Sequence, residues 1–402
     1  MSDFYQAGAV ATFHRLGKSS NERLEEELTW YCRGRPVALV LPSLYSEIGG
    51  AALRGIREQL KGAPYIGEVV VTLGPASQEE FERAKAFFSS LPQKTRIIWN
   101  TGPRIEALYR EIEAEDLITG EQGKGRAAWM AFGYVISRQE FHAVALHDCD
   151  ILTYKRDMLA RLCYPVANPN LDYDFCKGFY SRVTDRLHGR VTRLLVTPLI
   201  RTLQVILGYQ PLLVFFDSFR YPLAGEFSMD IHLARMNRVP GDWGFEMGVL
   251  AEVYRNTSLR RVCQVDVADA YEHKHQELSP GDATKGLHKM CVDICKSLFR
   301  NLASEGIVFS DGFFTTLVAT YAITAQDMLK RYEDDAAING LAFDRNEESL
   351  GVETFINGIK RASEMIMEDP LGVPLISSWD RVMSAIPDIM TRLREAVEQD
   401  NE

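Results

Sequence analysis

The segment FHAVALHDCDIL, Phe141 to Leu152, decides the expected fold. Its middle is an apolar run, residues 144–146, typical of a strand that is covered on both faces of a sheet. Two carboxylates, Asp148 and Asp150, follow the run directly. Ligands of open α/β sheets bind beyond the carboxyl ends of the strands, and carboxylate oxygens suit divalent cations such as Mg²⁺ and Mn²⁺. Taken alone, an Asp-x-Asp pair is more often part of a solvated turn than a metal ligand.

Strands and helices are expected to alternate before this segment. After an N-terminal extension that ends in a helix capped by Asn21, the expected strands are residues 36–42, 68–73 and 96–100, and the expected helices are 51–60, 78–88, 104–113 and 126–136. This alternation predicts a mostly parallel sheet with helices on both faces.

The second half of the chain changes character. Strands are expected at residues 172–180 and 259–267, and helices at 191–207, with an interruption near Pro198, and at 228–236, 244–254 and 282–302. From about Asp311 the pattern is helical and amphipathic, through residues 327–332, 352–367 and 379–397. A loop is expected at residues 369–374 and a frayed tail at 399–402.

Composition limits the possible functions. The 402 residues suffice for one large domain or two modest ones, and the net charge of -10 argues against a general binder of nucleic acid or membrane surfaces. The seven cysteines are scattered without a C-x-x-C pair, which suits a reducing cytoplasm. The N-terminus has no signal pattern, and the apolar stretches are too short to span a bilayer.

Several further motifs carry chemistry. LPSLYSE, Leu41 to Glu47, follows the first expected strand, where a nucleotide would lie. In GKG, residues 123–125, the glycines permit close backbone approach and Lys124 can meet a phosphate. The remaining motifs are CKGFYSR (176–182), HGRVT (188–192), LAGEFS (223–228), GDWGFEMG (241–248) and YEHKHQ (271–276).

In this order the motifs resemble those of glucosyl-3-phosphoglycerate synthases and their mannosyl relatives, which are retaining glycosyltransferases of the GT-A fold. The similarity runs with gaps from about Pro36 to Gln276. It implies a Rossmann-like, mostly parallel sheet flanked by helices, in a GT-A catalytic domain at residues 35–280. The residue pattern adds an N-terminal helical extension (1–34) and a helical C-terminal region (281–402), which lies largely outside the similarity. The implied reaction transfers a hexose from a nucleotide-sugar to 3-phosphoglycerate. Glucose is the expected sugar and mannose the alternative. The product would serve the synthesis of a glucosylglycerate-type compatible solute.

The resemblance also implies residue roles at the donor side. Asp150 and His273 would bind a divalent metal, Mg²⁺ or Mn²⁺, which neutralises the leaving diphosphate without proton transfer. The residues expected to contact the nucleotide-sugar are Pro42, Ser43, Leu44, Glu47, Lys124, Asp148 and Cys149.

At the acceptor side, the resemblance implies that the acid is bound by Gly189, Arg190, Thr192 and His275. A doubly anionic acceptor needs a local positive charge, which Arg190 would supply. Its guanidinium can form two parallel hydrogen bonds with a phosphate or a carboxylate. Glu246 and Glu226 would hold the sugar and the acceptor hydroxyl, and together with Asp150 they form the expected catalytic set. No protein nucleophile is assigned.

Other interpretations of these residues stay open from sequence. Lys124 could start a helix on a solvated face, and Arg190 and Arg193 could be surface charges. Glu226 could merely help to cap the next helix through its neighbour Ser228. Glu246 lies among apolar residues and needs a partner if it is buried. His273 and His275 compete for the metal.

Two departures from the family leave the donor base open among UDP, GDP and ADP. Residues 72–75 contain no acid where the family has one, and Tyr45 stands where Asn is common. Free glycerate is an alternative acceptor. A nucleotidyltransferase would need a Gly-rich phosphate loop, which LPSLYSE lacks, and a non-catalytic nucleotide-sugar binding protein would not need the whole set of site residues. The apolar C-terminal helices suit a lid or a homodimer interface.

Overall fold

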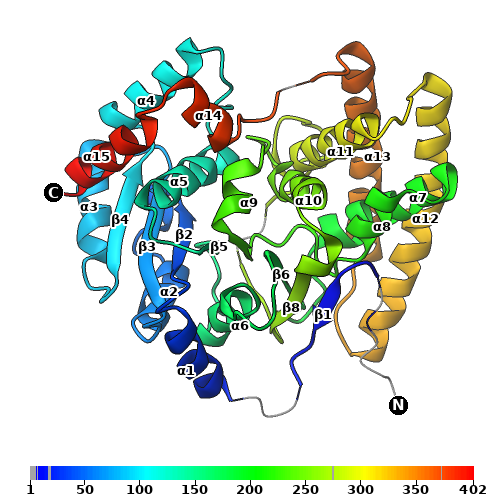
Figure 1. Ribbon diagram of the computed structural model, residues 1–402. Helices are drawn as coiled ribbons and strands as arrows, with labels where there is room; N and C mark the ends of the chain where they lie inside the picture. Colours follow the sequence, from blue (N-terminus) through cyan, green and yellow to red (C-terminus); the bar gives the residue numbers. More distant parts are fainter. Residues whose placement is uncertain (1–5, 7, 17–19, 274–275, 373) are drawn as a thin grey trace.

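The computed structural model describes residues 6, 8–16, 20–273, 276–372 and 374–402. Within these residues the centre is an eight-stranded sheet of order β1-β8-β6-β7-β5-β2-β3-β4 (Figure 1). β7 runs antiparallel to both of its neighbours and every other pair is parallel, which confirms the predicted mostly parallel α/β sheet. The strands are β1 (Ala11–Phe13), β2 (Val37–Ser43), β3 (Ile66–Leu73), β4 (Lys94–Trp99), β5 (Ala143–Leu146), β6 (Phe175–Tyr180), β7 (Phe227–Asp230) and β8 (Val262–Ala268).

Alternate residues of each strand point to opposite faces of the sheet and contribute to two hydrophobic layers. In β2, Leu39 and Leu41 join the core on one face, whereas Ala38 and Val40 join the core on the other. The first layer is closed by α1 (Asn21–Tyr31), α2 (Ala51–Leu60), α3 (Gln78–Phe88) and α6 (Arg156–Ala167). The second contains α4 (Pro103–Ala114), α5 (Lys124–Arg138), α7 (Thr197–Leu207), α8 (Pro211–Asp217), α9 (Ile231–Met236) and α10 (Phe245–Asn256).

The predicted helical C-terminal region is present and shares the second layer. Its helices are α11 (Gly286–Ser304), α12 (Asp311–Ile338), α13 (Arg345–Glu368), α14 (Trp379–Ala385) and α15 (Ile389–Asn401). α11, α12 and α13 pack together beside α7, whereas α15 crosses back to lie against α5 and β4 (Figure 1). The division of the chain at residues 34 and 280 stays a prediction.

The N-terminal extension differs from expectation in two ways. Residues 11–13 form a strand, β1, because their backbone pairs in parallel with Cys263 to Val265 of β8. Ser20, not Asn21, caps α1, since its Oγ accepts a hydrogen bond from the N–H of Arg23 at 3.0 Å.

Tertiary pairing also overrides local pattern in the second half. Residues 228–230, expected to begin a helix, belong to the strand β7 because β7 pairs with both β5 and β6. The helix expected at 191–207 is divided into a π-helical segment, Val191–Val196, and α7, which follows it directly. Pro198 lies in the first turn of α7, where its missing N–H is tolerated. Helix α6 was not expected from the sequence.

The tail is ordered as part of α15 rather than frayed. Asn401 binds the backbone of the edge strand β4, where its Oδ1 accepts from the N–H of Ile97 at 2.9 Å and its Nδ2 donates to the carbonyl of Ile97 at 2.8 Å. Arg104 donates to Asp400 at 2.6 Å. The helix therefore covers an edge that would otherwise offer unpaired backbone groups.

Candidate active site

A cavity of about 1260 Å³ lies where the strands present their carboxyl ends. Its wall includes Ser43 at the end of β2, Thr72 near the end of β3 and Tyr180 at the end of β6. The loop after β5 and the segment that follows β8 complete this edge. The parallel strands thus bring residues that are far apart in sequence into one hollow, as the position of the Asp-x-Asp segment predicts.

The first loop forms one end of the cavity. Pro42, Ser43, Leu44 and Glu47 all line it, as expected for the nucleotide side. The Glu47 carboxylate accepts the N–H of Leu44 at 2.8 Å and so fixes the short 3₁₀ turn Tyr45–Glu47. Burial raises the pKa of Glu47, and the neighbouring acidic loop raises it further, although the Leu44 N–H opposes this shift.

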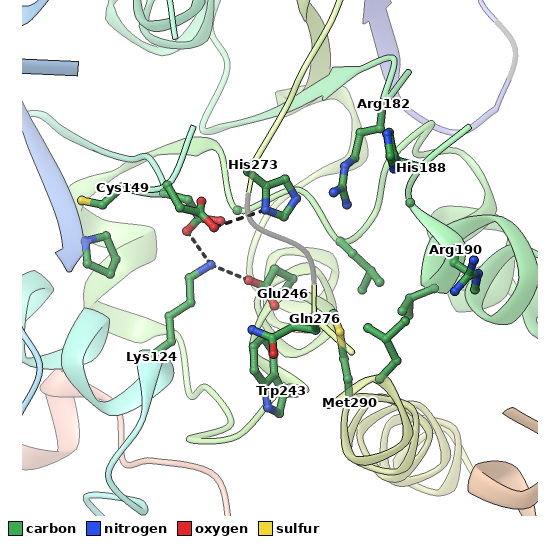
Figure 2. Close-up of a pocket in the computed structure, with 18 of the residues that line it drawn as sticks. Lys124, Cys149, Arg182, His188, Arg190, Trp243, Glu246, His273, Gln276 and Met290 are labelled. Carbon is green, nitrogen blue, oxygen red and sulfur yellow. Dashed lines mark hydrogen bonds and ion pairs between the residues drawn. The ribbon is translucent and has the colours of Figure 1, made fainter. Parts of the chain in front are cut away.

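Lys124 forms ion pairs with both Asp148 and Glu246 at the centre of the cavity (Figure 2). Its Nζ lies 2.7 Å from Asp148 Oδ1 and 2.8 Å from Glu246 Oε1. Burial alone would lower the pKa of Lys124, but the two carboxylates raise it above its usual value, so the side chain is a stable ammonium. Lys124 therefore points into the site rather than into solvent, and Glu246 has the partner that its burial requires.

The donor side also contains Cys149, which lines the cavity while being almost fully buried. Burial raises the pKa of its thiol well above the usual value, so Cys149 contributes a neutral surface. Thr72, Gly74 and Pro75, the segment without the family's acid, line the same end. The cavity wall is therefore uncharged at these four residues.

Asp150 and His273 lie next to each other, with 3.3 Å between Asp150 Oδ2 and His273 Nδ1 (Figure 2). An oxygen and a nitrogen donor at this separation fit a cation such as Mn²⁺ or Mg²⁺. Among the described residues no group of three or more His, Cys, Asp or Glu side chains gathers as a metal cluster. A cation held here would complete its coordination with water or substrate oxygens. His275 lies outside the described residues.

Glu226 lies beneath the acidic loop instead of in the cavity wall. Its Oε1 accepts from the hydroxyl of Tyr271 at 2.7 Å and from the N–H of Asp148 at 3.4 Å. Burial, followed by the charge of Asp148, raises the pKa of Glu226. Gly225 leaves the space that the Asp148 carboxylate occupies, because a Cβ there would collide with it.

The far end of the cavity is cationic. Gly189, with a φ of +72°, and Arg190 line it as expected, whereas Thr192 is buried outside the lining. Arg193, which could have been a surface charge, is only 9% exposed. Figure 2 shows Arg182, His188 and Arg190 across the cavity from Lys124. The basic residues that line this end are Arg182, Arg186, His188, Arg190, Arg193 and Arg345.

Most of these cations were not among the expected site residues. Their signal in the sequence was the density of basic side chains in residues 182–193. Arg345 had no such signal, because it belongs to α13 and comes to the cavity only through the tertiary fold. Trp243 and Met290, which line the middle of the cavity, were missed for the same reason (Figure 2).

The sheet order, the acidic loop after β5 and the Asp150–His273 pair define a glycosyltransferase of the GT-A type. Two curated relatives give the family. The chain is 47% identical over 401 residues to the glucosyl-3-phosphoglycerate synthase of Persephonella marina, covering 100% of this chain and 99% of that protein. It is 37% identical over 399 residues to that of Methanococcoides burtonii, covering 98% and 97%. The chain belongs to the glucosyl-3-phosphoglycerate synthase family. No protein-family model matches it.

Solved structures confirm the fold. The glucosyl-3-phosphoglycerate synthase of Mycobacterium tuberculosis, crystallised with Mn²⁺, UDP-glucose and phosphoglyceric acid, matches 76% of this chain and 90% of its own with a TM-score of 0.54 and 22% identity. The mannosyl-3-phosphoglycerate synthase of Rubrobacter xylanophilus matches 75% of this chain and 83% of its own, with a TM-score of 0.54 and 21% identity.

Proposed function

We propose that the protein transfers glucose from a nucleotide-sugar to 3-phosphoglycerate with a divalent cation, giving glucosyl-3-phosphoglycerate for a glucosylglycerate-type compatible solute. The observation that carries this proposal is the polarity of the cavity. Its first-loop end is lined by Pro42, Ser43, Leu44 and Glu47, its centre holds Lys124 between two carboxylates, and its far end gathers five arginines against three acids. A donor with a diphosphate and an acid acceptor fit these ends in that order.

The central residues suit the departure of a nucleoside diphosphate. A cation on Asp150 and His273 would neutralise the charge that develops on the leaving group. Lys124 supplies a second positive charge from the opposite wall and can donate to a phosphate oxygen. Glu246, held by Lys124, can accept hydrogen bonds from sugar hydroxyls.

The cationic end suits an acceptor with both a phosphate and a carboxylate. Gly189 and Arg190 stand at the start of the π-helical segment, and further arginines flank them. Free glycerate has one negative group and would use less of this charge. The proposal therefore favours 3-phosphoglycerate over glycerate as acceptor.

Release of nucleoside diphosphate tests the proposal. Purified protein is incubated with UDP-glucose, GDP-glucose, ADP-glucose or GDP-mannose, each with and without 3-phosphoglycerate, first with Mn²⁺ and then with EDTA. We expect metal-dependent release that requires the acid and a glucose donor. Release with GDP-mannose alone would favour the mannosyl alternative, and release that does not need the acid would remove 3-phosphoglycerate as acceptor. Pyrophosphate formation from a nucleoside triphosphate and a sugar phosphate would favour a nucleotidyltransferase, and tight binding without turnover a binding protein.

We further propose that the protein is a cytoplasmic homodimer. All seven cysteines are free thiols, which suits a reducing compartment. No helix in the described part of the chain is long and apolar enough to cross a membrane. The packed helices α7 and α12 leave Val205 76% exposed and Ile323 68% exposed, and Tyr209 after α7 is 79% exposed. Light scattering of the protein and of a Val205→Lys, Ile323→Lys variant tests this interface, with a monomeric variant as the expected result.

A further inference from the structure

The C-terminal region reaches the cationic end of the cavity through the start of α13. Residues 342–348, which lead into α13 and form its first turn, line the cavity beside residues 182–193. Backbone contacts join the two segments, because the N–H of Ala342 donates to the carbonyl of Asp185 at 2.8 Å and Ala342 forms a parallel bridge with Arg186. Both segments therefore build this end of the cavity.

Glu348 binds two of the arginines at once. Its Oε1 accepts from Arg190 Nε at 3.1 Å and Nη2 at 3.0 Å, and its Oε2 accepts from Arg193 Nη2 at 3.0 Å. The Glu348 side chain is only 8% exposed, so this charge-assisted arrangement is shielded from water. Gly351 gives the arginine room to lie on α13, since a Cβ there would be 2.8 Å from Arg190 Cδ.

Glu347 contacts the same arginine in a different environment. Arg190 Nη2 donates to Glu347 Oε1 at 2.9 Å, but the Glu347 side chain is 50% exposed. Exposed ion pairs of this kind contribute little free energy and exchange readily with other anions. Arg193 Nη1, in contrast, is buried without a hydrogen-bond partner among the described residues. Arg193 thus has a donor that Glu348 does not use, while its Nε donates to the carbonyl of His188 at 2.8 Å and its Nη2 to that of Leu187 at 3.3 Å.

We propose that Glu348 is a positioning residue that orients Arg190 and Arg193 toward the acceptor, and that Glu347 is a counter-ion that the acceptor's phosphate or carboxylate displaces. One buried carboxylate against two guanidinium groups leaves a net positive charge facing the cavity. Glu347 cancels that charge only while the acceptor is absent. This inference rests on the proposed function, because it assigns the arginines to the acid acceptor.

Steady-state kinetics of four single variants test the inference. The variants are Glu348→Gln, Gly351→Ala, Glu347→Gln and, as a control, Glu353→Gln, which changes an exposed acid of the same helix. We expect Glu348→Gln and Gly351→Ala to raise the KM for 3-phosphoglycerate about tenfold, with the KM for the nucleotide-sugar unchanged. Glu347→Gln removes the competing anion and should lower the acceptor KM severalfold. Glu353→Gln should match the wild type.

The acceptor KM should change in opposite directions in the variants of the two adjacent glutamates, Glu347 and Glu348. This difference distinguishes a positioning role of Glu348 from a general loss of structure. An unchanged acceptor KM in Glu348→Gln and Gly351→Ala, or a raised one in Glu347→Gln, overturns the proposal. Equal increases in both KM values would assign α13 a purely structural role and also overturn it. If the wild type releases no diphosphate with any donor, the proposed function fails instead, and calorimetric titration of 3-phosphoglycerate into the same four variants still decides the inference by the order of their affinities.

Discussion

Lys124 Nζ lies 2.8 Å from Glu246 Oε1, although the two residues are 122 positions apart in the chain. The contact joins the start of α5 to the start of α10 across the cavity, and the same ammonium also holds Asp148. The Lys124 ammonium therefore sets one positive charge between two carboxylates that come from different parts of the chain.

Lys124→Met should therefore reduce turnover strongly. The change removes the cation that opposes the leaving group and leaves the buried Glu246 and the half-buried Asp148 without their partner. We expect kcat to fall by about 100-fold or more, measured as nucleoside diphosphate release at saturating substrates. Lys61→Met, on the exposed end of α2, is the control and should keep wild-type turnover. Full activity of Lys124→Met would show that the ammonium has no role in the reaction.

Metal binding should depend on both Asp150 and His273. We expect Asp150→Asn and His273→Ala each to weaken Mn²⁺ binding by more than about tenfold, measured by calorimetry or electron paramagnetic resonance without substrate. His232→Gln, an exposed histidine on α9, should bind Mn²⁺ like the wild type. If His273→Ala binds normally, His275 takes its place as the candidate ligand.

Acid stability should depend on Glu398, which lies on α15. Partial burial would raise the pKa of its carboxyl, but Arg96, Lys94 and Tyr134 outweigh burial and lower the pKa to about 2 from 4.5. A carboxyl whose pKa is lowered on folding stabilises the protein above its unfolded pKa and loses this contribution as the pH falls from 4.5 toward 2.

Glu398→Gln tests this dependence. We expect the variant to be less stable than the wild type at neutral pH by about 2 kcal/mol, and the difference to shrink as the pH falls below 4.5. Urea denaturation at several pH values measures both quantities. A difference that stays constant down to acidic pH would contradict the assignment.

Gly133→Ala should destabilise the fold without touching the cavity. Gly133 lies in α5 where a Cβ would collide with the ring of Trp379, and that ring stacks on Trp129 with 4.2 Å between centroids. We expect a loss of about 1–3 kcal/mol from overpacking, measured by denaturation. Gly55→Ala in α2 is the matched control, because its Cβ would have no neighbour within 4 Å, and it should gain about 0.5–1 kcal/mol. Equal effects of the two substitutions would rule out the steric explanation.

The sequence predicted the features that are local in the chain. The apolar run of β5, the acids that follow it and the helix after GKG have patterns that depend on neighbouring residues alone, and their positions were confirmed. β1 and β7 were missed because three or four residues become a strand only when a partner edge is present. Glu348 was missed for a similar reason, since nothing near it in the chain indicates a distant pair of arginines.

The contact between Asn401 and Ile97 has a consequence for biosynthesis, because its two residues are 304 positions apart. A ribosome releases β4 into solution long before it makes α15. During that interval the outer edge of the growing sheet has open hydrogen-bonding positions, and nascent chains in this state can pair with one another. Docking of α15 is thus the step that protects this edge of the sheet from aggregation, and chaperone demand should be greatest in the interval before it.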